Sequence, residues 1–189
     1  MNEKLRKINE LYLQIQGPYI DISREEWLSP TPEERDEFEK HFDENSRIYR
    51  IAIEEFKKIA PNLSPEEVLE GYQQGCKLLQ RNLSGRMSQH FDMLYVPTMI
   101  QAVKNNEIHT AFMFLPALAA HLGEEVASII IDALDSKSPI IRERTLTAID
   151  DLNLLAAEPK IKTLVNDAEP EIALLAGKII ASWKDKFNF

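Results

Sequence analysis

The sequence predicts an all-α protein, and three observations support this prediction. Hydroxyl residues stand three positions before glutamates at several sites, which is the capping box that opens a helix. Apolar residues recur every three or four positions, a spacing that gives a helix one buried face. No stretch alternates apolar and polar residues with enrichment in β-branched side chains, so no strand is predicted.

Capping boxes mark three helix starts, at Ser23-Arg-Glu-Glu26, Thr31-Pro-Glu-Glu34 and Ser64-Pro-Glu-Glu67. In each, the hydroxyl accepts a first-turn N–H, and the glutamate accepts the N–H of the cap residue. In the second and third, proline takes the first helical position, where its missing N–H costs nothing. These signals place the starts more firmly than hydrophobic spacing alone.

Apolar spacing and stop signals give the bounds of the helices expected before residue 90. The first spans about Lys4–Gln16 and ends at Gly17-Pro18. The second, as one helix or two, stops at Pro61 and has an inward face of Phe38, Phe42, Tyr49, Ile53, Phe56 and Ile59. The third runs from Pro65 to about Asn82, with an inward face of Val68, Leu69, Tyr72, Cys76 and Leu79.

The C-terminal half repeats itself at a fixed interval. Asp135-Ser-Lys-Ser-Pro139-Ile-Ile-Arg142 is followed by Asp167-Ala-Glu-Pro170-Glu-Ile-Ala173, and Pro170 lies 31 residues after Pro139. We call this shift of 31 residues the repeat interval. It aligns Leu152 with Trp183, so Trp183 is expected at a packing position. A unit of this length is one helix–turn–helix, which cannot bury its apolar face alone, so such units stack on one another.

Residues from about Leu94 to Trp183 resemble the short-form HEAT repeats. The mark of that family is an apolar helix, an Asp-containing turn, and Pro-x-Val-Arg opening a second helix. Pro139-Ile-Ile-Arg142 fits this pattern, and Pro170-Glu-Ile fits it except that Ala173 replaces the arginine. The segment Lys104–Leu134 has neither the proline nor the arginine, so its assignment as a repeat depends on spacing alone.

The resemblance implies an α-solenoid of short HEAT-like helix pairs, preceded by an N-terminal helical region. We expect residues 1–90 to form that region, as a cap or as degenerate repeats, and residues 91–189 to form the repeats. The expected repeat units are about 104–134, 135–165 and 166–189, all within one continuous domain.

Several residues of the repeats have expected structural roles. Asp135 and Asp167 are expected to cap the second helices. Arg142 is expected to pair with a carboxylate of the neighbouring unit, with ligand binding as the alternative. Pro116 is expected to kink a helix, and Pro97 to kink a helix or begin one.

The second helices line the inner, binding face of the solenoid in this family. In the helix 139–152, the positions not used for packing are Glu143, Arg144, Thr147, Asp150 and Asp151. Shifting these positions back by the repeat interval gives Phe112, Met113, Pro116, Ala119 and Ala120. Shifting them forward by it gives Leu174, Leu175, Lys178, Ala181 and Ser182. The apolar members either pack under the N-terminal helices and the tail at Phe187 and Phe189, or form an exposed patch for a partner.

The chain is acidic, and the acid is concentrated in one segment. It has 22 basic and 31 acidic residues, a net charge of −9, and residues 25–44 carry −7 of it through nine acids and two bases. Such a field attracts a basic partner and argues against direct nucleic-acid binding. The candidate contacts are Glu33, Asp36, Glu37, Glu39 and Asp43. The alternative is a solvated helix start, where acids are favoured.

No motif for catalysis, a metal or a cofactor is present. The one cysteine, Cys76, cannot form an internal disulfide and is expected to be a core residue rather than a nucleophile. No two of the four histidines are four residues apart, and no HExxH or phosphate-binding glycine loop occurs. We therefore expect a protein that is not an enzyme and has no catalytic residue, metal or cofactor.

A cytoplasmic location without membrane contact is expected. No apolar segment with a cleavage site follows the basic N-terminal residues. Apolar runs such as Ala111–Ala120 are shorter than the roughly 20 residues that a membrane helix needs.

These observations favour a non-catalytic protein-binding module, monomeric rather than oligomeric. The most concrete hypothesis is a stoichiometric inhibitor of a basic protein, such as a bacterial immunity protein that neutralises a nuclease toxin. The partner-binding candidates on the repeats are Glu143, Arg144, Thr147 and Asp151. One alternative, implied by the resemblance, is a HEAT-like enzyme of the lyase or DNA glycosylase type. Another is an oligomerising scaffold, for which exposed Leu174 and Leu175 would be the cue.

Overall fold

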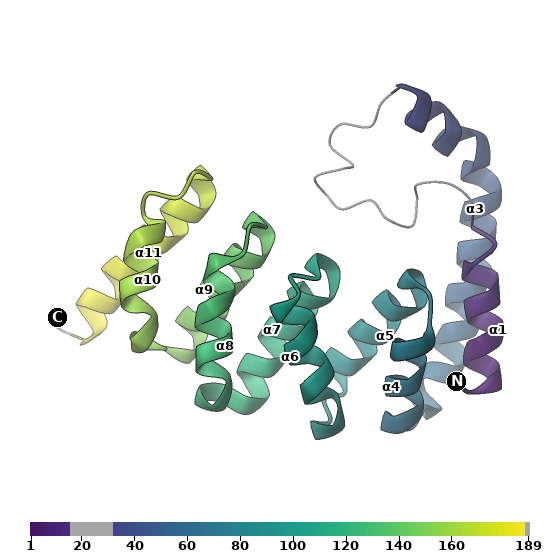
Figure 1. Ribbon diagram of the computed structural model, residues 1–189, viewed down its shortest axis with the longest axis horizontal. Helices are drawn as coiled ribbons and strands as arrows, with labels where there is room; N and C mark the ends of the chain where they lie inside the picture. Colours follow the sequence, from purple (N-terminus) through teal and green to yellow (C-terminus); the bar gives the residue numbers. More distant parts are fainter. Residues whose placement is uncertain (16–31, 188–189) are drawn as a thin grey trace. The chain divides into compact units, whose positions relative to one another are not determined.

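The computed structural model describes residues 1–15 and 32–187, apart from the side chains of residue 32 and of residues 34–40. The described backbone is helical and contains no strand, which confirms the all-α prediction (Figure 1). Its contacts divide into two compact units, Met1–Tyr95 and Val96–Phe189, here called unit 1 and unit 2.

Unit 1 consists of helices that pack around a short first helix. Its elements are α1 (Glu3–Tyr12), α3 (Pro32–Ile59), the 3-10 turn η2 (Ala60–Asn62), α4 (Pro65–Gln74), α5 (Lys77–Gln89) and the 3-10 turn η3 (Met93–Tyr95). Helix α1 packs on both α3 and α5. Its fully buried Tyr12 lies 6.0 Å from Tyr49 between ring centroids and accepts a 2.6 Å hydrogen bond from Asn82 Nδ2. Burial raises the pKa of Tyr12 well above its ordinary value.

The capping box at Ser64 is confirmed. Ser64 Oγ accepts the N–H of Glu67 at 3.3 Å, and Glu67 Oε2 accepts the N–H of Ser64 at 3.0 Å. The boxes predicted at Ser23 and Thr31 lie outside the described residues. Helix α3 is one continuous helix, and the first helix ends at Tyr12 rather than Gln16.

The helix expected from Pro65 to Asn82 is two helices, because Gly75 and Cys76 are extended, with ψ of 159° and 166°. A Cβ on Gly75 would lie 2.6 Å from the carbonyl oxygen of Gly71, so the close approach at this break requires glycine. Helix α5 then runs on to Gln89. Cys76 is therefore the half-buried N-cap of α5, and its expected place on an apolar helix face is wrong.

One aromatic residue of α3 is also less buried than expected. Phe42 was predicted to face inward, but 47% of it is exposed. Among the described side chains of α3 the first buried one is Asn45, followed by Ile48, Ala52 and Phe56. Among the described side chains of α3, burial therefore begins one turn after Phe42, and the side chain of Phe38, also predicted to face inward, lies outside the described residues.

Unit 2 consists of short helices joined by tight turns. Its elements are α6 (Val96–Lys104), α7 (Ile108–Leu122), η4 (Gly123–Val126), α8 (Ala127–Asp132), η5 (Ala133–Asp135), α9 (Pro139–Leu152), η6 (Leu155–Ala157), α10 (Glu158–Leu164) and α11 (Pro170–Phe187). Helix α6 packs on α7, α8 on α9, and α10 on α11. Pro97 is the second residue of α6 and so begins a helix, whereas Pro116 lies inside α7.

Helices begin at a constant interval along the chain. The first helices of the pairs in unit 2 begin at positions 96, 127 and 158, and the second helices at positions 108, 139 and 170. Each step equals the repeat interval between Pro139 and Pro170. In unit 1, α4 and α5 begin at positions 65 and 77, which is one more such interval before α6 and α7. The spacing therefore reaches into the N-terminal region, where the sequence showed no repeat.

Burial follows the same interval even where the residue type changes. In the first helices, Val68, Met99, Ile130 and Ile161 are all fully buried. In the second helices, Leu83, Phe114, Thr145 and Ala176 are all fully buried. Trp183 is also fully buried, which confirms its predicted packing position.

Among the described residues, one helical stretch, Ile108–Asp135, has the length and apolar composition to cross a membrane. That stretch carries fully buried side chains, Phe114 and Leu118 among them, and core helices meet the same criterion. Its first helix, α7, ends at Leu122, and the next residue, Gly123, has a φ of 52°.

Two apolar positions separated by one repeat interval provide a test of this packing. Leu134 is 2% exposed, whereas its counterpart Val165 in the next pair is 41% exposed. Leu134→Ala is expected to lower the free energy of unfolding by about 2–5 kcal/mol, because it leaves a cavity. Val165→Ala is expected to change it by less than about 0.5 kcal/mol. Urea unfolding followed by circular dichroism measures both, and equal effects would contradict the assigned packing.

Candidate functional site

The exposed sides of the second helices α7, α9 and α11 form the candidate site, here called the second-helix face. Helix α7 packs on α9 and α9 on α11, so the three helices lie next to one another within unit 2. Of the positions that the sequence placed on this face, Ala119 is buried at 4% exposure and all others are half-buried or exposed. The shift by the repeat interval therefore located the surface correctly on each helix.

The apolar part of this face lies near the starts of α7 and α11. Leu174 is 60% exposed, which favours the alternative of an exposed patch at this position, and Phe189 of the tail lies outside the described residues. Leu175, Phe112 and Met113 are half-buried. A large aliphatic side chain thus remains accessible to a partner on this face.

Arg144 lies between these apolar groups and is held against α7. Its guanidinium carbon stands 3.9 Å from the ring centroid of Phe112, a cation–π geometry. The charge of Arg144 is therefore directed at a ring of the same unit.

Glu143, Thr147 and Asp151 follow one line of α9, at every fourth position, and all three are exposed. The line is roughly 12 Å long at the helical rise per residue. Thr147 Oγ1 donates to the carbonyl oxygen of Glu143 at 3.1 Å, so its hydroxyl is engaged within the helix. Among the described residues, the carboxylates of Glu143 and Asp151 have neither an ion pair nor a hydrogen bond. Both charges therefore face solvent.

The described part of the acidic segment, residues 32–44, lies on α3, in unit 1, and its residues 25–31 lie outside the described residues. Glu33 and Asp43 are exposed, and Asp36, Glu37 and Glu39 belong to the same helix, with side chains outside the described residues. The Glu44 carboxylate accepts a 2.7 Å hydrogen bond from Arg47, which lowers the pKa of Glu44. The predicted contact residues thus belong to two surfaces, one in each unit.

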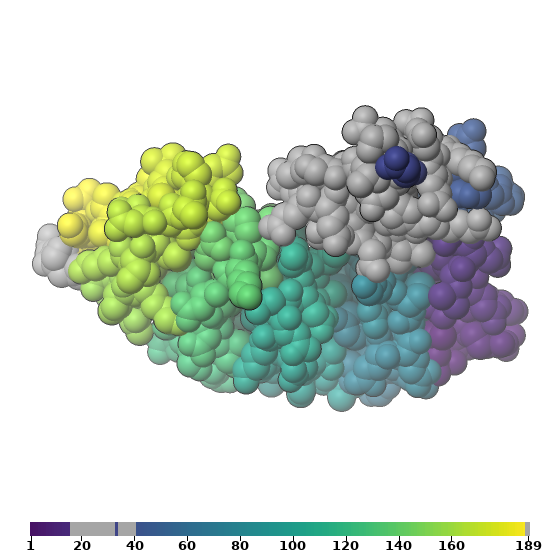
Figure 2. Space-filling model, turned by 45° about the horizontal axis from the view of Figure 1, so that its top comes forward, coloured from purple at the N-terminus to yellow at the C-terminus, as the bar shows by residue number. Residues whose placement is uncertain are grey.

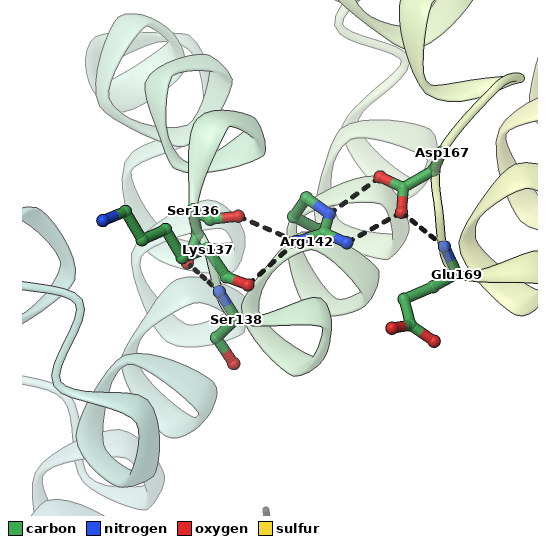
Figure 3. Close-up of polar contacts among 6 residues, drawn as sticks. All are labelled: Ser136, Lys137, Ser138, Arg142, Asp167 and Glu169. Carbon is green, nitrogen blue, oxygen red and sulfur yellow. Dashed lines mark hydrogen bonds and ion pairs between the residues drawn. The ribbon is translucent and has the colours of Figure 1, made fainter.

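Arg142 is engaged in a structural network (Figure 3). Its Nε and Nη2 donate to the two carboxylate oxygens of Asp167 at 2.9 and 2.7 Å. Its Nη1 donates to the carbonyl oxygens of Ser136 at 2.9 Å and Lys137 at 3.1 Å. The predicted pairing of Arg142 with the next helix pair is confirmed, and the alternative of ligand binding is not supported.

Ser136, rather than Asp135, is the counterpart of Asp167. Ser136 Oγ accepts the N–H of Ser138 at 3.1 Å, and Asp167 Oδ1 accepts the N–H of Glu169 at 2.9 Å, from the second residue ahead in each case. The predicted cap at Asp135 is therefore wrong, and its carboxylate instead accepts a 2.6 Å bond from Lys160. The repeat interval aligns Ser136 with Asp167, so the sequence could have predicted that Ser136 is the residue equivalent to Asp167.

No group of three or more histidine, cysteine, aspartate or glutamate side chains within residues 1–15 and 32–187 could hold a metal ion. Comparisons of the chain with protein-family models, curated proteins and solved structures found no match.

The Arg142–Asp167 pair predicts a pH-dependent stability. Burial alone would raise the pKa of Asp167, but hydrogen bonds from Arg142 and from the Glu169 amide, together with the charge of Arg142, leave it below 3.8. The unfolded chain therefore takes up the proton first as the pH falls. The stabilisation is complete above the ordinary pKa of aspartate and is lost as the pH falls through the lowered pKa.

Arg142→Gln leaves Asp167 buried without its cation, and is expected to cost about 3 kcal/mol at neutral pH. The difference from the unmodified protein should shrink as Asp167 becomes protonated in acid. Arg144→Gln is the matched control, with an expected cost below about 1 kcal/mol because it loses a ring contact rather than an ion pair. Urea unfolding at a series of pH values measures both, and a pH-independent difference for Arg142→Gln would refute this account of the pair.

Proposed function

We propose that this protein is a non-catalytic protein-binding module built as a solenoid of short HEAT-like helix pairs. We further propose that it is a stoichiometric inhibitor of a basic protein, in the way that a bacterial immunity protein neutralises a nuclease toxin. The repeat part of the proposal is supported by the constant interval between helix starts and by the burial that repeats with it. Stacked helix pairs offer a long, rigid surface of the kind that binding modules use.

The choice of a basic partner is based on which charged side chains of α9 are paired and which face solvent. Both of its arginines are engaged inside unit 2, Arg142 with Asp167 and Arg144 with the ring of Phe112. Its exposed acids Glu143 and Asp151 have no such partner among the described residues. The outward charge of α9 is therefore negative, although its sequence contains nearly equal numbers of acidic and basic residues.

The surroundings of these acids favour a protein surface over a small ion. Leu174 is exposed on the neighbouring helix α11, and a protein interface combines an apolar centre with charged groups at its rim. Exposed Glu33 and Asp43 on α3 add a second acidic surface. Acidic surfaces of this kind raise the association rate with basic proteins and make binding sensitive to salt.

The test begins with an affinity pull-down from native lysate at low and at high salt, read by mass spectrometry. The proposal expects one basic protein that is retained at low salt and weakened at high salt. The captured protein is then purified and titrated by calorimetry, with an expected ratio of one to one. Recovery of only acidic or neutral proteins, or of none, would refute the proposal.

Charge reversal locates the contact. Glu143→Lys with Asp151→Lys is expected to weaken binding of that basic protein by at least about tenfold, because two attractions become repulsions. The triple reversal at Asp36, Glu37 and Glu39 tests the α3 surface in the same way. Glu125→Lys is the matched control, an exposed acid of unit 2 in the turn η4, and should leave the affinity nearly unchanged. An equal loss in the control would mean that net charge alone determines binding.

A further inference from the structure

Arg144 is a cation whose hydrogen-bond donors have no acceptor within the described part of the chain. Its guanidinium carbon lies 3.9 Å from the ring centroid of Phe112, and the side chain is half-buried. A guanidinium carries five N–H donors, and an aromatic ring offers them neither an oxygen nor a nitrogen atom. Among the described residues, Arg144 makes no hydrogen bond and no ion pair. The ring therefore positions the guanidinium but leaves its donors open.

Arg142, on the same helix, shows what such donors bind. Its Nε and Nη2 donate to the two carboxylate oxygens of Asp167 at 2.9 and 2.7 Å. The planar guanidinium matches a carboxylate through two parallel bonds, which are among the strongest hydrogen bonds in proteins. Arg144 has the same donors without the carboxylate.

Arg144 lies where a protein bound to the second-helix face would cover it. Its helix, α9, packs between α7 and α11, and the side chains of successive helix pairs in unit 2 adjoin one another (Figure 2, teal-green to yellow). Glu143 is the preceding residue, and Asp151 stands two turns later on nearly the same side of the helix. A stable interface covers about 800 Å² of each partner, far more than the area between these side chains. A protein that binds Glu143 and Asp151 therefore also covers Arg144.

Covering Arg144 is unfavourable unless the partner supplies an acceptor. A guanidinium that loses its water without gaining a hydrogen-bonded anion carries a large desolvation penalty. The acids Glu143 and Asp151 attract basic proteins in general, whereas Arg144 disfavours those that bring no acceptor. Discrimination between related partners commonly depends on a penalty of this kind against the wrong one.

We infer that Arg144 is the specificity-determining residue of the second-helix face. The basic partner presents a carboxylate to Arg144, flanked by the cations that bind Glu143 and Asp151. This inference rests on the proposed function and names the chemistry of the partner's contact surface. Phe112 holds the guanidinium in place before the partner arrives, so less conformational entropy is lost on binding. A free phosphate is disfavoured at Arg144, because the two acids repel a multiply charged anion.

Neutralisation of Arg144 tests the inference, because attraction between net charges predicts the opposite sign. Arg144→Gln removes a positive charge, which by itself would strengthen binding of the basic protein captured in the pull-down. The inference expects calorimetry to show binding of that protein weakened by at least about tenfold. Lys137→Gln is the matched control, the same change of charge at an exposed position in the turn before α9. It should bind the captured protein at least as tightly as the unmodified chain.

Poly-lysine serves as a second probe, since its side chains include cations and no carboxylate. Arg144→Gln should bind poly-lysine at least as tightly as the unmodified protein, because the penalty for covering Arg144 is gone. A loss of affinity for both poly-lysine and the captured protein would assign Arg144 a structural role and overturn the inference.

A double-mutant cycle identifies the carboxylate. The exposed acids of the captured protein are replaced one at a time by their amides. One replacement should weaken binding to the unmodified chain by about tenfold and have little further effect on binding to Arg144→Gln. If reversal at Glu143 and Asp151 weakens binding but Arg144→Gln does not, the inference fails while the proposed function stands. If no basic protein is retained, both fail.

Discussion

The constant interval between helix starts is the constraint on which the rest of the structure depends. A helix turns by about 100° per residue, so one residue added inside a helix would rotate the later side chains of that helix away from their places in the core. The interval is kept while the residues change, as the buried series Leu83, Phe114, Thr145 and Ala176 shows. Thr145 is tolerated there because its hydroxyl donates to the carbonyl oxygen of Ile141 at 2.7 Å.

The sequence predicted the parts of the fold whose signals are local and chemically specific. The capping box at Ser64, the helix starts at Pro139 and Pro170, and the pairing of Arg142 all follow from short motifs and are confirmed. The pair α4–α5 was missed because extended Gly75 and Cys76 replace the Asp turn, and Lys77 replaces the proline. The spacing of the helices and the burial that repeats with it relate that pair to the others, and both are known only from the three-dimensional structure.

The candidate site was predictable in position but not in electrostatics. The shift by the repeat interval placed every position of the site on the surface except Ala119. A sequence cannot show, however, that Phe112 takes up the charge of Arg144, or which carboxylate of the next helix pair binds Arg142. These pairings leave Glu143 and Asp151 as the outward charges of α9, a result that requires knowledge of which side chains meet in space. The exposure of Leu174 is of the same kind, because it depends on which side chains pack against it in space.

Side-chain hydrogen bonds join α11 and the turn before it to α9. Arg142, Asp150 and Asn153 of α9 and its turn bind Asp167, Trp183 and Lys186, so within the described residues α11 has a helix pair on this side. In a structure of successive helix pairs, a pair with a neighbour on one side opens more readily than a pair with two. Amide hydrogens of α10 and α11 should consequently exchange with solvent faster than those of α8 and α9. Any molecule that covers α10 and α11 would slow that exchange. The amide exchange rate of these two helices would therefore show whether a molecule is bound to them.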